Sequence, residues 1–165
     1  MNIFYLDPDP QKCAQYHCDK HVIKLILETA QLLEAVHIIA GSVTPYSTGK
    51  KGWSNHPCAA WAAKSIENYL WLCNLGQELC KEYNYRYEKI HALQKRIQWY
   101  FQNPPKLKNI GFTEPYQAVG EELRNEKLDA VSAYRRYYQT IKKDIVTWEK
   151  KRKMPEWMKK NSGEF

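Results

Sequence analysis

The sequence predicts an all-α protein folded as one compact domain, residues 1–165, with about four main helices. Apolar residues recur at spacings of three and four over long stretches of the chain. Helix start signals stand at Asp9-Pro10 and at His56-Pro57, and Pro104-Pro105 supplies a stop signal. No stretch has the sustained two-residue alternation of a strand, and the length is typical of a single domain.

The first long helix is expected over residues 10–40. Asp9 is a suitable N-cap, and Pro10 fits the first helical position because that residue needs no backbone donor. Gly41 can end the helix in the left-handed conformation. Residues 42–54 are rich in Gly, Ser, Thr, Pro and Lys and are expected to form a loop.

Three further helices are expected along the rest of the chain. The second begins at His56-Pro57 and runs over residues 57–83, and the third covers 87–101. Residues 104–120 are expected to be irregular. A fourth helix is expected over 129–151. It forms the first part of a basic C-terminal helix and tail, residues 129–165.

The first helix carries a polar stripe in an otherwise apolar stretch. At about 100° per residue, His17, His21, Lys24 and Glu28 fall within about 60° of one another, and Gln31 joins them. A helix that is apolar on its other sides is usually buried. Burying these groups is costly unless they satisfy one another or a ligand, so the stripe is a candidate functional site. The alternative is a solvated stripe on a surface helix.

Charge and aromatic content favour a nucleic-acid partner. The formal net charge is +7, and the chain has 6 Trp and 12 Tyr. Basic residues attract phosphates, and aromatic rings stack on bases, although these rings also suit a protein core. Between positions 142 and 160 there are three acidic residues and eight basic ones: Lys142, Lys143, Lys150, Lys151, Arg152, Lys153, Lys159 and Lys160. The alternative for this stretch is a solvated terminal helix.

Other candidate substrate contacts lie outside the first helix. Asn55 and His56 stand at a helix start, where phosphates bind readily, although plain capping explains them as well. Arg86 could clamp a phosphate or stack on a base. Arg135 and Arg136 lie within a Tyr-Arg-Arg-Tyr-Tyr run.

The five cysteines indicate a reducing compartment, because they form no CxxC pair and no signal peptide or membrane-length apolar run is present. We therefore expect a cytoplasmic protein of a bacterium or an infected host cell, with no membrane contact, no metal and no cofactor. The oligomeric state is left open. A zinc site remains an alternative, with ligands drawn from two clusters: Cys13, His17, Cys18, His21, His56 and Cys58.

The run His17-Cys-Asp19-Lys-His21-Val, with Glu28 seven residues after His21, resembles a known pattern. The pyrimidine-dimer DNA glycosylases of the phage endonuclease V type carry Leu-Ala-Asp-x-His-Leu, with a catalytic Glu seven residues after the His. The His-Pro helix start and the Met154-Pro-Glu-Trp157 stretch are also similar to that family. A vaguer similarity links the Asp-Lys-His-Val and Tyr-Arg-x-Tyr-Tyr runs to uncharacterised phage and large-virus proteins.

The resemblance implies a small, basic, all-α enzyme acting on duplex DNA. In that family an α-amino group attacks the sugar C1′, a Schiff base forms, and β-elimination cuts the strand. Carried over, Glu28 stabilises the cationic sugar and moves protons, and His21 contacts a phosphate or the substrate. We expect the neighbouring His17, Asp19, Lys20 and Gln31 among the substrate contacts.

The chain also departs from the family pattern. Asn2 is bulky, so we expect Met1 to be kept and to supply the amine. Leu27 and Gln31 stand where the family has arginines, the segment before the motif is five residues longer, and Lys24 offers a second amine.

The predicted function is a DNA glycosylase, with or without lyase activity, acting on a damaged or modified base through Glu28, His21, Lys24 and Met1. The alternative is a non-catalytic nucleic-acid-binding or architectural protein of phage or viral type. A metal-dependent hydrolase is a distant third.

Overall fold

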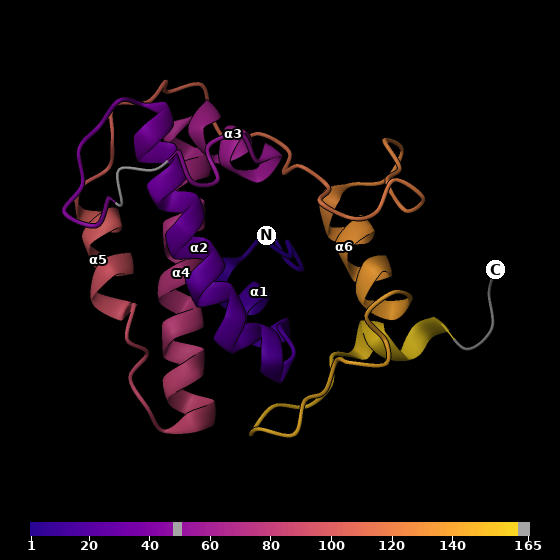
Figure 1. Cartoon of the computed structure of the whole chain (residues 1–165). Coiled ribbons are helices and arrows are strands. Elements are labelled where there is room, and N and C mark those ends of the chain that lie inside the picture. The colour runs from indigo at the N-terminus through magenta and orange to yellow at the C-terminus, as the bar shows by residue number, and fades with distance from the viewer. Residues whose placement is uncertain (48–50, 162–165) are drawn as a thin grey trace.

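The computed structural model describes residues 1–47 and 51–161, with side chains to Lys159, and within these residues the protein is all-helical (Figure 1). Part of the predicted loop (48–50), the end of the predicted basic tail (162–165) and the side chain of Lys160 lie outside this description. The elements in chain order are α1 (Pro10–Tyr16), α2 (Asp19–Ile39), α3 (Pro57–Lys64), α4 (Ile66–Tyr87), α5 (Gln94–Gln102), α6 (Ala130–Gln139) and the 3₁₀ helix η1 (Glu156–Asn161).

The first predicted helix is two helices, which corrects the expectation of one helix over 10–40. His17 and Cys18 have extended backbones, with ψ of 135° and 162°, so α1 ends before them and α2 begins at Asp19. Donors from distant parts of the chain satisfy the carbonyls that this break exposes. Arg86 Nη1 donates to the His17 carbonyl at 2.9 Å, and Trp148 Nε1 donates to the Tyr16 carbonyl at 3.1 Å. His17 therefore does not lie on the helix that carries Glu28.

The second predicted helix is also divided, at Ser65. This residue is extended (φ −148°, ψ 157°), and its hydroxyl caps α4 by accepting from Asn68 N at 3.1 Å. The backbone N–H of Ile66 donates to the carbonyl of Lys108 at 2.8 Å, a partner in the irregular stretch. The predicted helix start at Pro57 is confirmed, with His56 as its cap.

The last two predicted helices are shorter than expected. Helix α4 runs on to Tyr87 and ends where Glu88 adopts the left-handed conformation (φ 54°), so α5 begins only at Gln94. Helix α6 ends at Gln139, well before residue 151. The chain beyond it is held by contacts with the start of α2, where Asp19 N donates to the Thr147 carbonyl at 2.9 Å.

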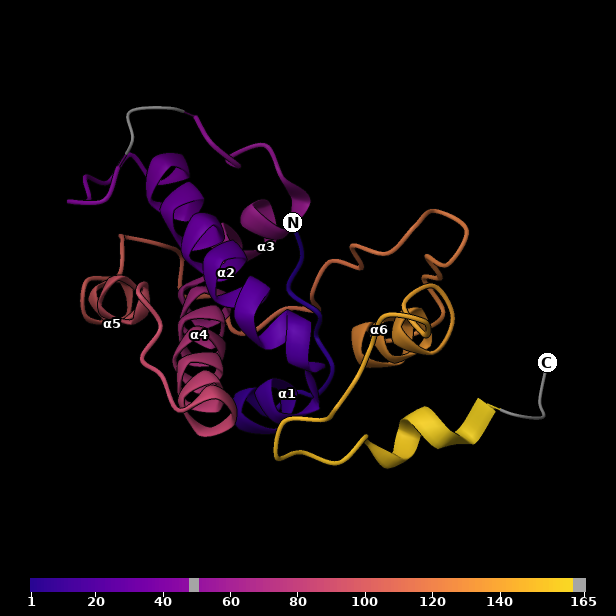
Figure 2. The same ribbon diagram turned by 60° about the horizontal axis from the view of Figure 1, so that its bottom comes forward.

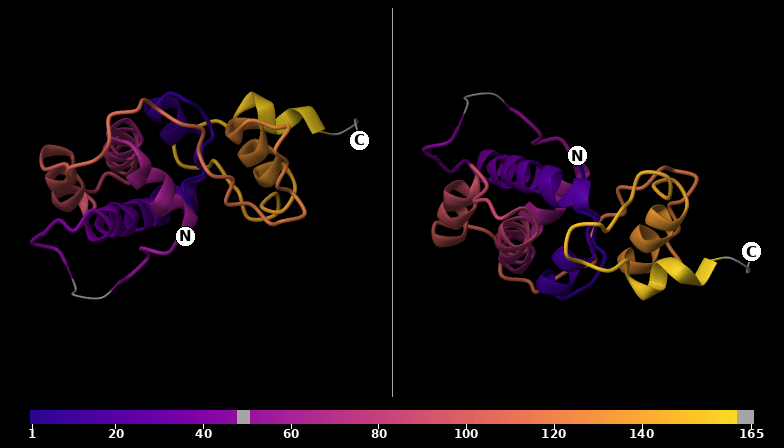
Figure 3. Two further views of the ribbon diagram at one scale, coloured as in Figure 1. Left: turned by 90° about the horizontal axis from the view of Figure 1, so that it is seen from above. Right: turned by 90° about the horizontal axis from the view of Figure 1, so that it is seen from below.

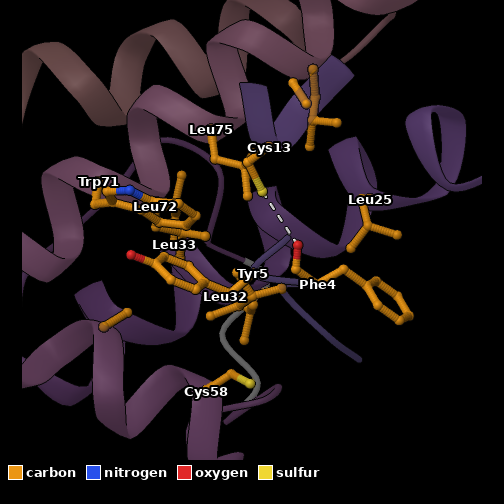
Figure 4. Packing of buried hydrophobic residues seen from close by; sticks show 14 of the residues in the cluster. Phe4, Tyr5, Cys13, Leu25, Leu32, Leu33, Cys58, Trp71, Leu72 and Leu75 are labelled. Carbon is orange, nitrogen blue, oxygen red and sulfur yellow. Dashed lines mark hydrogen bonds between the residues drawn. The ribbon is translucent and has the colours of Figure 1, made fainter. Parts of the chain in front are cut away.

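The first residues of the chain run between two groups of helices. Helix α2 packs along α4, with α1, α3 and α5 around them, and α6 and η1 lie on the other side of the N-terminal segment (Figures 2 and 3). Ile3, Tyr5 and Leu6 are buried in this position. The Cys13 thiol donates to the Phe4 carbonyl at 3.3 Å and fixes α1 against the segment (Figure 4).

The core joins α2, α4 and the N-terminal segment. Figure 4 shows Tyr5 beside Trp71 and Leu72 of α4 and Leu32 and Leu33 of α2. All five cysteines are buried and free of disulfides. Within the described residues, no helix is long and apolar enough to cross a membrane.

Candidate active site

The carboxylate of Glu28 lies inside the protein, against the first two residues of the chain. Glu28 is 7% exposed, and its Oε2 accepts a hydrogen bond from Asn2 N at 2.8 Å. The α-amine of Met1 lies 4.0 Å from the same oxygen, and Lys24 Nζ lies 3.4 Å from Oε1. A buried carboxylate is therefore bracketed by two amines and a backbone N–H, which offset the cost of its desolvation.

The side chain of Asn2 shapes the turn that brings the α-amine to Glu28. Its Oδ1 accepts from Ile3 N at 2.8 Å and from Phe4 N at 3.1 Å, and its Nδ2 donates to the Ala118 carbonyl at 2.7 Å. Phe4 adopts a left-handed backbone (φ 48°), which a non-glycine residue holds only where its surroundings impose it. Asn2 and Phe4 were not among the predicted site residues. The one local signal was the tendency of Asn to bond nearby backbone N–H groups.

His21 is buried, with 6% of its surface exposed, and is uncharged at neutral pH. Its ring stacks on Phe4 at 4.4 Å between centroids, and its Nδ1 lies 2.6 Å from the Tyr138 hydroxyl. Burial, together with the nearby basic groups of His17, Lys142 and Lys24, lowers the pKa of His21 to about 3. Any contact that His21 makes with DNA is therefore a hydrogen bond and not an ion pair.

The outward side of α2 is open to solvent, which corrects the expectation of a helix buried nearly all round. Ile23 and Leu27 are 42% and 46% exposed, and the Lys24 side chain is 67% exposed. Lys20 is exposed and Gln31 is half-buried on this helix. Lys24 thus connects the buried carboxylate of Glu28 to the surface, where a large substrate could bind.

His56 approaches the same site from the start of α3. Its Nδ1 accepts from Cys58 N at 3.1 Å, which caps the helix, as the alternative interpretation expected. Burial lowers the pKa of His56, the positive chain start lowers it further, and Glu28 raises it, so both groups lie within electrostatic reach. Asn55 is exposed beside it. Farther along α2, a hollow of about 150 Å³ is lined by Gln31, Glu34, Ala35, Ile38, Gly52 and Trp53.

Asp19 and Arg86 lie away from Glu28, in a buried ionic network at the start of α2. Arg86 is 3% exposed and donates to Asp19 Oδ1 at 3.0 Å and to Glu82 Oε1 at 2.9 Å. Its remaining donors reach the carbonyls of Gln15 and His17 at 3.0 and 2.9 Å. These contacts occupy the guanidinium within the protein, so the geometry supports a structural role for the pair.

Arg135 joins α6 to the N-terminal segment. Its Nε donates to the Leu6 carbonyl at 2.9 Å, its Nη2 lies 3.2 Å from Asp7 Oδ2, and its guanidinium lies over the ring of Trp157 at 5.3 Å. Arg136 is half-buried on the same helix. The structure therefore does not bring either arginine into contact with Glu28, and their predicted contacts with substrate stay a prediction.

Three buried histidines make stability depend on pH. Burial lowers the pKa of His17 and of His37 to about 4, and that of His21 to about 3, against 6.5 in an unfolded chain. Below pH 6.5 the unfolded state binds protons that the folded state does not, so stability is complete above this pH and falls as the pH drops toward 4. We expect the free energy of unfolding to fall by about 1.4 kcal/mol per pH unit for each histidine.

Urea unfolding at pH 7, 6, 5 and 4 measures this effect. His37→Gln removes one titrating group, so its slope of stability against pH should be shallower by about 1.4 kcal/mol per unit. Equal stability at pH 7 and pH 5 would contradict the assignment of uncharged buried rings.

The zinc alternative finds no support in the geometry. Among the side chains that the structure describes, no three His, Cys, Asp or Glu residues come close enough together to hold a metal ion. Cys13 and His17 instead bond to backbone carbonyls, of Phe4 and Cys13 respectively.

Comparison with known proteins finds a family match for more than half of the chain. Residues 1–98 match the family described as pyrimidine dimer DNA glycosylase, and this region covers Met1, His21, Lys24, Glu28 and all of helices α1 to α4. The chain belongs to the pyrimidine dimer DNA glycosylase family. This protein is therefore a DNA glycosylase, and DNA is its partner. No curated protein and no solved structure matches the chain.

The matched region of this glycosylase ends inside α5, so α6 and the chain beyond it lie outside the family match. These later residues nevertheless complete the site. Tyr138 of α6 bonds to His21, and the Ala118 carbonyl holds the side chain of Asn2.

Proposed function

We propose that this glycosylase breaks the glycosylic bond of one base of a pyrimidine dimer in duplex DNA, with Glu28 as the acid/base group and the α-amine at the chain start as the nucleophile. The observation that carries the proposal is the buried Glu28 carboxylate, 4.0 Å from the Met1 amine and 2.8 Å from Asn2 N. Expelling a base builds positive charge on the sugar, so a fixed carboxylate in a dry site stabilises the transition state most.

The proposed reaction begins when the neutral α-amine bonds to C1′ as the bond between C1′ and the base breaks. The base leaves with the bonding electron pair and takes a proton from water. One amine proton passes to Glu28 and on to the sugar ring oxygen, which leaves C1′ with its electron pair and so produces a protonated Schiff base. In the lyase step, C2′ loses a proton and the 3′-phosphate departs with the electrons of the C3′–O bond.

The α-amine suits this chemistry better than Lys24 does. A free α-amine has a pKa near 8, about two units below that of a lysine, so more of it is neutral at pH 7. The buried Met1 side chain fixes the α-amine beside Glu28, whereas the Lys24 side chain is 67% exposed. Removal of Met1 would make Asn2 N the α-amine, and that atom lies 2.8 Å from Glu28. An α-amine therefore lies close to Glu28 whether the chain starts at Met1 or at Asn2.

The substrate contacts form around this centre. We expect Lys20, Lys24 and Gln31 to meet DNA along the outward side of α2, with Asn55 and His56 at the start of α3. The target nucleotide must leave the base stack so that the α-amine can reach its C1′. In this arrangement His21 contacts the substrate as an uncharged ring.

The second candidate is a DNA-binding protein without catalysis. It is favoured by one observation, the 3.4 Å ion pair between Glu28 and Lys24, because a carboxylate already paired needs no substrate. The two candidates differ in whether a covalent intermediate forms.

Borohydride trapping tests the proposal directly. We expect the protein, incubated with a duplex that carries one thymine dimer, to break the glycosylic bond of one thymine, which stays joined to its neighbour through the cyclobutane ring. We also expect an adduct that borohydride makes permanent. Tryptic mapping should place the adduct on the peptide that ends at Lys12, because that peptide carries the α-amine. The variant Lys24→Arg keeps the charge but removes the side-chain amine, and it should trap DNA as well as the unmodified protein does.

Two outcomes would contradict this assignment. An adduct on Lys24 would move the nucleophile to that side chain. Binding to the dimer duplex with neither cleavage of the glycosylic bond nor an adduct would favour the non-catalytic candidate.

A further inference from the structure

A basic segment, residues 147–153, is fixed to the protein surface near the start of α2. Asp19 Oδ2 accepts from the backbone N–H of Glu149 at 2.7 Å and of Lys150 at 3.2 Å. At the other end, Arg152 donates two hydrogen bonds to the Glu82 carboxylate, at 2.7 and 3.0 Å. Figure 2 shows this part of the chain passing beside α1 before η1 begins. The segment is thus ordered before any partner arrives, which lowers the entropy cost of binding.

The amines of the basic segment point to solvent. Lys150, Lys151 and Lys153 are exposed, and Lys151 pairs with Glu88 at 2.8 Å. Within the described residues, neither Lys150 nor Lys153 has a carboxylate within 4 Å. The ionic network therefore uses Arg152 internally and leaves these two lysines as outward charges.

The segment and the candidate active site contact the same helix, α2, at opposite edges of its exposed side. Asp19, which holds the segment, and Glu28 are nine residues apart, which is about 14 Å along the helix axis and about two and a half turns around it. Exposed Lys20 and Lys24 lie on the surface between them. Base pairs of B-DNA rise about 3.4 Å each, so a separation of at least about 14 Å corresponds to at least about four base pairs.

We propose that the basic segment binds the phosphate backbone of the substrate duplex at least about four base pairs from the reacting nucleotide, through Lys150 and Lys153. This inference rests on the proposed function, because it takes the position of the target nucleotide at Glu28 as its origin. Phosphate contacts set the position of a protein on DNA and carry most of the salt dependence of binding. In this arrangement Asp19 is a positioning residue that acts on DNA through the segment it holds.

Salt-dependent binding to duplexes of different length tests the surface. The variant K150Q/K153Q is compared with K95Q/K106Q, which removes the same charge from two exposed lysines on and just after α5. On a dimer duplex with ten base pairs on each side, the first variant should lower the slope of log K against log salt by about 1.8, which is about 0.9 for each lost phosphate contact. The control should leave the slope as it is.

Shortening the duplex locates the contact. With two base pairs left on the contacted side of the dimer, the unmodified protein and K150Q/K153Q should have the same slope, whereas shortening the other side should preserve their difference. An unchanged slope on the long duplex, or a difference that survives shortening of either side, would overturn the proposal. If the unmodified protein bound the dimer duplex no more tightly than an undamaged one, the proposed function would be rejected. The contact of the basic segment could still be tested, because the salt dependence of binding to a long undamaged duplex also depends on Lys150 and Lys153.

Discussion

Replacement of Glu28 by Gln should abolish cleavage of the glycosylic bond while DNA binding stays nearly unchanged. The amide keeps the size of the carboxylate and still accepts the hydrogen bond that Asn2 N donates at 2.8 Å. It carries no charge to stabilise a cationic sugar and takes no proton from the amine. Electrostatic and acid/base contributions of this kind are each worth about 10²–10³-fold or more, so we expect kcat to fall by at least about 10³-fold. Single-turnover cleavage of the glycosylic bond in a dimer duplex, at saturating protein, measures this loss.

Glu34→Gln is the matched control on the same helix. Glu34 is also a largely buried carboxylate with a basic partner, Arg96, but it lies on a different turn of α2 from Glu28. We expect this variant to keep its activity. A Glu28→Gln protein that cleaved the glycosylic bond at more than a tenth of the normal rate would show that another group performs the acid/base step. A parallel loss in both variants would trace the effect to stability.

The fold class could be predicted because its signals are local. Pro10 and Pro57 stand at the first positions of α1 and α3, and Asp9 and His56 cap these helices through side-chain contacts two residues away. The depth of Glu28 was also predictable, since apolar residues flank it at helical spacing. In each case the residues that decide the structure lie within one or two turns of one another.

The helix breaks were not predictable, because long-range contacts stabilise them. Nothing near His17 ends a helix, and the break depends on Arg86, 69 residues away, donating to its carbonyl. The same holds for the chain after α6. Its apolar spacing favours a longer helix, but its backbone bonds to Asp19 instead, 130 residues away. Tertiary contacts outweigh helix propensity at both places.

The spacing of residues predicted the candidate site only on the α2 side, and the place of the Met1 amine followed only from the family resemblance. The spacing of Lys24 and Glu28 is a property of one helix, and the structure keeps it. The other side depends on Asn2, whose amide reaches Ala118 across 116 residues and whose backbone reaches Glu28 across 26. No pattern in the sequence marks a pairing of that kind.

Replacement of Arg86 by Met should cost about 3–5 kcal/mol of unfolding free energy. Breaking a buried ion pair leaves an uncompensated charge in the interior, and Arg86 neutralises two carboxylates, of Asp19 and Glu82, which are 6% and 4% exposed. Met fills much of the same space but supplies no donor to them. Arg152, which also pairs with Glu82, cannot replace the bond to Asp19. Urea unfolding at pH 7 measures the loss.

Arg96→Met is the comparison that separates this network from an ordinary ion pair. Arg96 pairs with Glu34, and these side chains are 18% and 12% exposed, against 0% and 9% for Arg86 and Asp19. Water offsets part of the loss, so we expect it to cost about 1–3 kcal/mol. Equal costs in the two variants would show that burial adds nothing to the Arg86 network.

In Arg86→Met we also expect faster tryptic cleavage after Lys150 and Lys151 under native conditions, because Asp19 then lacks the partner that fixes its carboxylate against the basic segment. The network would thereby connect the stability of the α2 start to the surface that we propose binds DNA.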